Sequence, residues 1–119
     1  MLQLVNTKET YEVPYEVDGK EQAVFVLRKL SMREVNTIDD KIAVMKNDSV
    51  EFLGGTSSRM KINYGLVDWK GIQLDGKDVP CTEANKELIP SSVSQFLVNK
   101  INEDNGLKAT DKSETNEKN

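Results

Sequence analysis

Apolar and polar residues alternate along the first regular segment of the chain. In TYEVPYEV, residues 10–17, every second residue from Tyr11 to Val17 is apolar, as expected of a strand with one buried face. Asp18-Gly19 follows, a dipeptide typical of a tight hairpin turn. EQAVFVLRKL, residues 21–30, then alternates again. The pattern predicts a β-hairpin over residues 10–30.

The two predicted strands differ in their surroundings. Pro14 has no N–H to donate to a ladder, so the first strand is expected at an edge of the sheet. In the second strand Phe25 and Leu27 share one face, whereas Val24 and Val26 share the other. We therefore expect part of this strand to be covered on both sides. The lead-in, residues 1–9, is weakly patterned, and its apolar residues allow one further short strand.

A helix is predicted to begin after Ser31. Ser31 is a favourable N-cap, and Glu34 three residues later completes a capping box. Apolar residues then recur at spacings of three and four, which places them on one stripe of a helix that Asn47-Asp48 ends. This stripe consists of Met32, Val35, Ile38, Ile42 and Met45. It is interpreted first as core, and alternatively as a partner-binding face, because methionine-containing faces adapt to varied apolar helices.

Further elements are predicted from caps, breakers and turns. Val50 and Phe52 alternate like a strand, but Gly54-Gly55 are expected to break the chain. A second helix then runs from a cap at Thr56 or Ser57 to about residue 67.

The part that follows contains two more predicted helices. Asp75-Gly76 makes a tight turn between two short extended pieces, and Thr82 caps a short helix over residues 83–89. Ser91 or Ser92 caps the last helix, residues 92–102. Its inward residues are expected to be Val93, Phe96, Leu97 and Ile101.

These elements predict an α+β fold in which a β-hairpin, or small antiparallel sheet, packs on a small bundle of about four helices. The length of 119 residues fits one domain, residues 1–102. Residues 103–119 are polar and charged with almost no apolar content, so a disordered tail is expected there.

Composition narrows the function classes. The net charge is −4 at pH 7, and no basic cluster offsets it, which argues against nucleic acid as a partner. No apolar run approaches the roughly 20 residues of a membrane span, and no signal peptide is visible. Cys81 is the single cysteine, so no intramolecular disulfide forms. These features favour the cytoplasm of the producing cell.

The sequence offers few candidate residues for catalysis or metal binding. The chain has no histidine, so Cys81 has no imidazole base to activate it and is interpreted as a small buried residue. Asp39 and Asp40 are interpreted as part of a solvent-exposed helix face. The spacing of Asp68, Asp75 and Asp78 does not match that of a Ca²⁺-binding loop. We expect no catalytic residue, no cofactor and no bound metal. The enzyme alternative is a metal-dependent hydrolase that uses these last three aspartates.

Trp69 is the only tryptophan and has two interpretations. A small domain usually buries its one tryptophan in the core because the ring removes a large area from water. Tryptophan is also enriched among the residues that dominate protein–protein interfaces. Core is the preferred interpretation, with a partner-binding anchor as the alternative.

The stretch from residue 62 to residue 101 resembles a known family. A helix ends in a glycine-hydrophobic-hydrophobic-x-tryptophan run at Gly65-Leu66-Val67-Asp68-Trp69. An Asp-Gly turn, a Val-Pro pair at residues 79–80, a Thr-capped helix and a helix after Pro90 follow. This order of signals resembles the tail assembly chaperones of long-tailed bacteriophages. Cys81 stands where that family often has an aromatic or other apolar residue, which agrees with its interpretation as a filler.

The resemblance implies a non-enzymatic protein of virion morphogenesis. Such a chaperone binds the tape measure protein, keeps it soluble, helps to recruit the tail tube protein, and is absent from the mature virion. It implies action in the host cell cytoplasm and self-association, and the partner surface is expected in a groove between helices or at an open sheet edge. The alternative is a structural tail or neck component of the phage virion.

Overall fold

The fold is known from a computed structural model that describes residues 1–45 and 53–107, with backbone only for residues 42–45, 53 and 54. Along the chain lie β1 (Thr10–Val17), β2 (Lys20–Arg28), α1 (Met32–Met45), α2 (Leu53–Gly65), β3 (Leu66–Lys70), β4 (Gln73–Leu74), β5 (Lys77–Asp78), α3 (Glu83–Lys86) and α4 (Ser91–Asp104). The described residues thus form a mixed α+β fold of a three-stranded antiparallel sheet, a separate two-stranded hairpin and four helices, and the predicted fold class is confirmed.

The predicted hairpin is confirmed. Strands β1 and β2 pair antiparallel, and both turn residues have a positive φ, 54° at Asp18 and 79° at Gly19. Two positive φ angles define the turn type whose twist matches that of the flanking strands. The strand order is β1-β2-β3, so β1, which carries Pro14, is an edge strand as expected.

The capping box at the start of α1 is confirmed by reciprocal hydrogen bonds. The backbone N–H of Glu34 donates to Ser31 Oγ at 3.1 Å, and that of Ser31 donates to Glu34 Oε1 at 2.9 Å. Arg28, at the end of β2, donates from Nη1 to the same Glu34 carboxylate at 3.0 Å. This one carboxylate therefore fixes both the helix start and the angle at which α1 leaves the sheet.

Two predicted boundaries of α2 are wrong. The helix begins at Leu53 and includes Gly54-Gly55, so Thr56 and Ser57 lie inside it instead of capping it. It ends at Gly65 and not near Val67, because Leu66 is fully buried in β3 and pairs with Leu27. A Cβ atom at position 65 would lie 3.1 Å from Ile101 Cδ1, so a glycine here permits the close approach of α2 to α4. The predictions for Val50, Phe52 and Asn47-Asp48 lie outside the described residues.

The C-terminal half follows the predicted order with shifted ends. The Asp75-Gly76 turn is confirmed by φ angles of 53° and 80°. Thr82 caps α3 by accepting the N–H of Asn85 at 3.2 Å, but this helix is shorter than predicted. The predicted serine cap of α4 is wrong, since Pro90 is the N-cap and Ser91 is already helical.

The expected boundary of the tail falls too early. Helix α4 continues through Glu103 to Asp104, and Leu107 packs against the core. Asn105 Oδ1 accepts the backbone N–H of Leu30 at 2.8 Å, and Tyr11 Oη donates to Asp104 Oδ2. Residues 103–107 therefore belong to the folded domain, because their polar side chains tie the end of α4 to β1 and to the link between β2 and α1.

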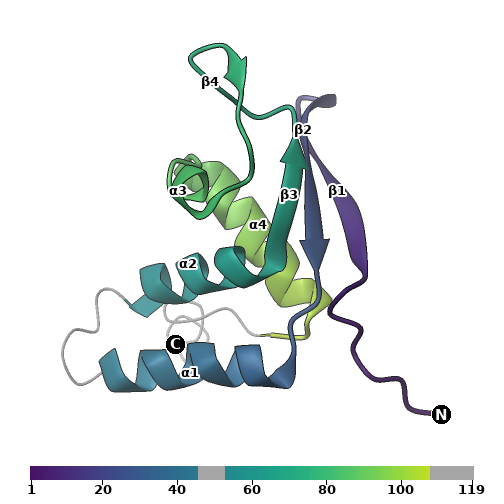
Figure 1. Cartoon of the computed structure of the whole chain (residues 1–119), viewed down its shortest axis with the longest axis vertical. Coiled ribbons are helices and arrows are strands. Elements are labelled where there is room, and N and C mark those ends of the chain that lie inside the picture. Colours follow the sequence, from purple (N-terminus) through teal and green to yellow (C-terminus); the bar gives the residue numbers. More distant parts are fainter. Residues whose placement is uncertain (46–52, 108–119) are drawn as a thin grey trace.

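One buried cluster holds these elements together. The helices gather on one side of the sheet, with α2 and α4 nearest to it and α1 beside α2 (Figure 1). The buried apolar residues are Val13, Ala23, Phe25, Leu27, Leu30, Ile38, Ile62, Leu66, Trp69, Leu97, Val98 and Ile101. Of the predicted inward residues of α4, Leu97 and Ile101 are fully buried, and Val93 and Phe96 pack partly buried against the cluster.

Candidate binding surfaces

Trp69 lies in the core. Its side chain is 6% exposed and stands opposite Phe25 of β2. Its indole Nε1–H donates to the backbone oxygen of Val79 at 2.8 Å, and the N–H of Val79 donates to Ile72 O at 3.1 Å. Residues 71–80 form a protruding segment around β4 and β5, and Trp69 anchors its base to the sheet (Figure 1). The ring is therefore not available to a partner in this conformation.

The predicted stripe of α1 is divided between core and surface. Ile38 is buried, and Val35 packs partly buried against the core cluster. Met32 is 80% exposed at the first turn of the helix. Ile42 and Met45 lie in α1, but their side chains are outside the described part. Ile38 belongs to the same buried cluster as Trp69, but the two lie on different elements, since α1 packs against α2 and Trp69 lies in β3.

The aspartates near Trp69 have structural partners. Asp68 Oδ1 accepts the backbone N–H of Trp69 at 2.8 Å, and Asp78 Oδ1 accepts Gln73 Nε2 at 3.1 Å. Asp75 occupies the turn between β4 and β5. Within residues 1–45 and 53–107, no three of the side chains of His, Cys, Asp and Glu gather closely enough to hold a metal ion.

Cys81 is half-buried and packs against the core. Burial is the main cause that raises the pKa of its thiol, and the nearby Lys86 ammonium opposes the shift. A raised pKa keeps the thiol protonated and weakly nucleophilic at neutral pH. Its surroundings suit a packing residue, as the sequence predicts.

Both outer edges of the three-stranded sheet carry features that hinder pairing with another strand. Edge strand β1 contains Pro14 and a bulge between Tyr15 and Glu16. Edge strand β3 has only five residues and a register shift opposite Val26/Leu27, and the Asp68 carboxylate occupies the N–H of Trp69. Proline, bulges and charged side chains are the usual means by which proteins block edge-to-edge association. The expectation of an open sheet edge for a partner therefore finds little support in the geometry.

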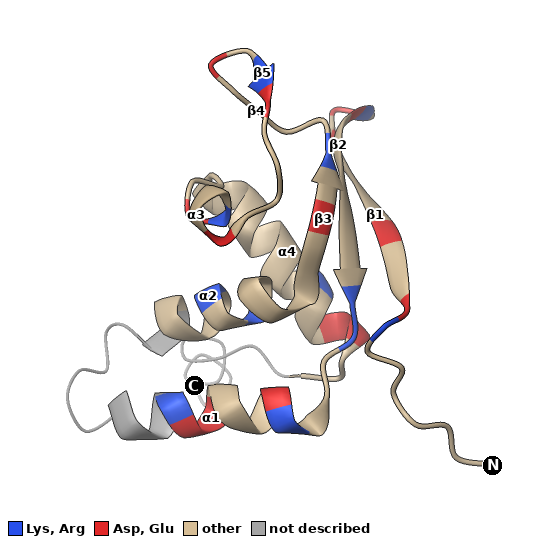
Figure 2. Cartoon of the chain, viewed as in Figure 1, with Lys and Arg blue, Asp and Glu red and all other residues tan. Residues whose placement is uncertain are grey.

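The sheet face opposite the core is small and partly polar. Val24 and Val26 are half-buried on this face and are not part of the core cluster, so the expected covering of β2 on both sides is not seen among the described elements. Lys70 Nζ reaches across β2 and donates to Glu12 Oε2 at 2.8 Å, which raises the pKa of Lys70. Acidic and basic residues are interspersed along β2, α1 and the β4–β5 hairpin (Figure 2).

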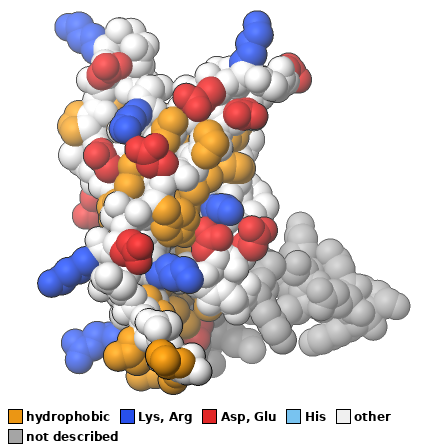
Figure 3. Space-filling view, turned by 90° about the vertical axis from the view of Figure 1, so that its right-hand side faces the viewer, with side chains coloured by type: hydrophobic (Ala, Val, Ile, Leu, Met, Phe, Trp, Pro, Cys, Tyr) orange, Lys and Arg blue, Asp and Glu red, His pale blue; other side chains and the backbone are white. Residues whose placement is uncertain are grey.

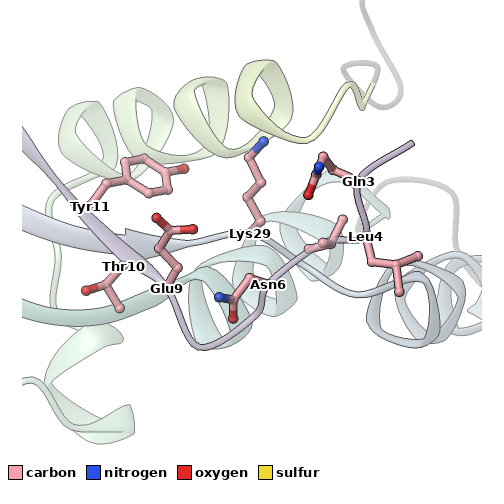
Figure 4. Close-up of a pocket in the computed structure, with 8 residues that line it drawn as sticks. Gln3, Leu4, Asn6, Glu9, Thr10, Tyr11 and Lys29 are labelled. Atoms are coloured by element: carbon pink, nitrogen blue, oxygen red, sulfur yellow. The ribbon is translucent and has the colours of Figure 1, made fainter. Parts of the chain in front are cut away.

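The largest group of exposed apolar side chains lies at the N-terminal segment. Leu2 and Leu4 are 89% and 88% exposed, and Met1 and Val5 are exposed as well. Residues 1–6 form no strand, and a hollow of about 560 Å³ separates them from Tyr11 of β1 and from Lys29 (Figure 4). In the space-filling view, hydrophobic side chains gather at the lower end and in a band between charged groups (Figure 3).

The sequence carries a signal for this surface in the residues that allow a short strand. Leu2, Leu4 and Val5 are apolar residues with no matching partner segment nearby in the sequence. An apolar segment that lies outside every periodic element is a candidate contact for another molecule.

Comparisons with known protein families, with curated proteins and with solved structures found no match to this chain. Among the described helices, none combines the length and the apolar character that crossing a membrane requires.

Proposed function

We propose that this chain is a tail assembly chaperone of a long-tailed bacteriophage, which binds the tape measure protein and recruits tail tube subunits in the host cell cytoplasm. The proposal rests on the resemblance of residues 62–101 to that family. The observation that carries it is how several of those residues are used: Gly65, Gly71, Trp69 and Thr82 have structural roles in the segment from the end of α2 to α3, and Gly65 also faces α4.

The structural roles of these residues depend on their residue types. Gly65 permits α2 to approach Ile101 of α4, and Gly71 has a φ of 80° that suits only a glycine. Trp69 holds the base of the protruding segment through Val79, and Thr82 caps α3. The residues that carry the resemblance therefore act together in one part of the fold. Chance is less able to produce such a connected set than a few unrelated short sequence matches.

The chemistry of the described surface agrees with a binding protein that remains soluble. Charges of both signs cover the molecule, which favours solubility, and large apolar side chains are exposed at a few separate places. Among the predicted partner-binding residues whose side chains are described, Met32 is the one that is exposed. A chaperone for a long apolar helical chain needs weak, repeated contacts, and exposed methionine suits them because its side chain adapts to different apolar surfaces.

Co-expression with the tape measure protein from the same gene cluster tests the proposal. We expect this chain to increase the soluble fraction of the tape measure protein, and Met32→Asp to reduce that increase. Val17→Asp is the matched control, because Val17 is also exposed but lies at the tip of the hairpin. An unchanged soluble fraction with the wild-type chain would refute the chaperone role.

Mass spectrometry of purified virions separates the chaperone from a structural tail or neck component. The proposed chaperone is expected in infected cells and absent from finished particles. Recovery of the chain from particles in fixed ratio to the tail tube protein would favour the structural alternative.

A further inference from the structure

We propose that residues 1–6 form an association arm that pairs antiparallel with the same arm of a second copy, about a two-fold axis at Gln3. This inference does not depend on the proposed function. It follows from three features of the arm: its separation from the body, its unpaired backbone and the symmetry of its apolar pattern.

A defined turn directs the arm away from the sheet. The N–H of Glu9 donates to Asn6 O at 3.3 Å, and the N–H of Lys8 donates to Asn6 Oδ1 at 3.0 Å. These bonds close a turn over residues 6–9, so the arm does not continue the line of β1. The hollow of about 560 Å³ beside it leaves room for another segment next to Leu4 and Tyr11 (Figure 4).

Both the backbone and the apolar side chains of the arm are available for contact with another chain. Within the described part of the chain, the backbone groups of residues 1–5 make no hydrogen bond, and no large apolar side chain of the arm is buried. An extended segment of this kind gains backbone hydrogen bonds by pairing with another strand. The two sheet edges of the same molecule are hindered, as described above, so a second arm is the better partner.

The sequence Met-Leu-Gln-Leu-Val is symmetric in apolar character about Gln3. In antiparallel pairing centred there, Leu2 of each arm lies opposite Leu4 of the other. Opposite residues share a face, so the leucines gather on one side of the ribbon. Met1 lies opposite Val5 on the other side, where the two glutamine amides meet each other. A contact between two identical arms requires such a self-complementary pattern. Binding of a client protein with an unrelated sequence would not require it.

The buried area limits how strong this contact is. Burying one large aliphatic side chain removes about 60–120 Å² from water, given roughly 1.5–3 kcal/mol per side chain at about 25 cal/mol per Å². For the four apolar side chains of each of the two arms, the total is at most about 500–1,000 Å². Interfaces that persist in solution begin at roughly 1,000 Å². At this lower limit we expect a weak, reversible dimer that dissociates on dilution.

Sedimentation velocity of the full chain over a dilution series tests the dimer. Wild type is expected to pass from dimer to monomer on dilution, and Leu4→Asp is expected to be monomeric throughout with an unchanged melting temperature. Val17→Asp introduces the same charge at another exposed apolar site and should dimerise like wild type. A monomeric wild type, or a Leu4→Asp variant that dimerises like this control, would overturn the proposal.

Cross-linking tests the register. Residues that face each other in antiparallel pairs have Cα atoms about 4.5–5.5 Å apart, within the range that a disulfide spans. In a Cys81→Ser background, Gln3→Cys is expected to form an intermolecular disulfide on mild oxidation, whereas the exposed Lys8→Cys control does not. Equal cross-linking by the two variants would exclude the axis at Gln3. If Leu4→Asp lowers client solubility while wild type alone stays monomeric, the arm belongs to the client and not to a second copy.

Discussion

Trp69 fills the core with its ring and holds a second segment with its indole N–H. Trp69→Ala removes both and is expected to lower the free energy of unfolding by about 3–5 kcal/mol, as for other large-to-small core changes. Trp69→Phe keeps most of the apolar area but leaves Val79 O without its donor, at a cost of about 1–3 kcal/mol. Urea denaturation followed by far-ultraviolet circular dichroism measures both, since the change removes the fluorophore.

An unchanged stability of the Trp69→Ala variant would favour the interpretation of Trp69 as a partner-binding residue. If Trp69→Ala unfolds at the same urea concentration as wild type, its burial contributes nothing to stability. The core position would then be an incorrect description of the solution structure, and the interface interpretation would return.

Individual residues differ in how visible their roles are in the sequence. Ser31, Glu34, Asp18 and Asp75 were assigned correctly, because caps and tight turns depend on a few neighbouring residues. Asn105 was assigned to a disordered tail, although its side chain accepts the N–H of Leu30. A hydrogen bond between residues so distant in the chain leaves no apolar periodicity, so the patterns that reveal helices and strands do not reveal it.

The protruding segment between β3 and α3 depends on two glycines in different surroundings. Both Gly71 and Gly76 have a φ of 80°, which costs a residue with a Cβ about 1–2 kcal/mol. A Cβ at Gly71 would also lie 3.3 Å from Gln22 O, whereas a Cβ at Gly76 meets nothing within 4 Å. We therefore expect Gly71→Ala to lower stability more than Gly76→Ala. Chemical denaturation of the two variants side by side measures the difference, and equal losses would show that the strand readily moves aside.

The junction between β2 and α1 should depend on pH through Glu34. The hydrogen bond from Arg28 is the main cause that lowers the pKa of this carboxyl from its ordinary value of 4.5, and burial opposes the shift. A lowered folded pKa means that the unfolded chain binds the proton more tightly, so the charged carboxylate stabilises the fold above pH 4.5. This contribution is lost as the pH falls through the folded pKa.

Glu34→Gln tests this dependence because glutamine also serves in a capping box. At pH 7 the variant is expected to be about 1–2 kcal/mol less stable than wild type, and the difference should shrink as the pH is lowered below 4.5. Glu87→Gln is the control, since Glu87 forms only an exposed pair with Arg59 at 3.5 Å and should change stability by less than about 1 kcal/mol. A difference for Glu34→Gln that is constant with pH would contradict the role of its charge.

At the scale of elements, the hairpin and α1 were predictable, but β3 was not. Strands β1 and β2 alternate over many residues, and their turn is local. Strand β3 follows α2 directly at Leu66, and its helix-like apolar spacing continues from Tyr64 to Val67. Its strand conformation is set by pairing with β2, a contact distant in the sequence. Helix α2 also begins before Gly54-Gly55, although glycine has a weak intrinsic helix preference.

The whole molecule limits how it associates with others. The sheet edges are hindered, the outer sheet face is small, and the charges are interspersed, which leaves the exposed apolar side chains as the main adhesive features. The fold class follows from the sequence, but the sequence does not decide which residues of an apolar helix stripe are exposed. Met32 and Ile38 belong to one apolar stripe, and only the packing of α1 against α2 decides which is exposed.

The extent of the folded domain gives a final prediction. Leu107 packs against the core cluster at the end of the described part, and the sequence of residues 108–119 is polar and charged apart from Ala109. Deleting residues 108–119 should leave the melting temperature nearly unchanged. Deleting residues 103–119 also removes the acceptor of the Leu30 N–H, the Asp104 acceptor of Tyr11 Oη and the packing of Leu107. Losses of this kind sum to roughly 3 kcal/mol, which lowers the melting temperature of a domain of this size by at least about 10 °C. Thermal unfolding followed by circular dichroism compares the two truncations, and equal melting temperatures would place the end of the folded domain at Asn102 after all.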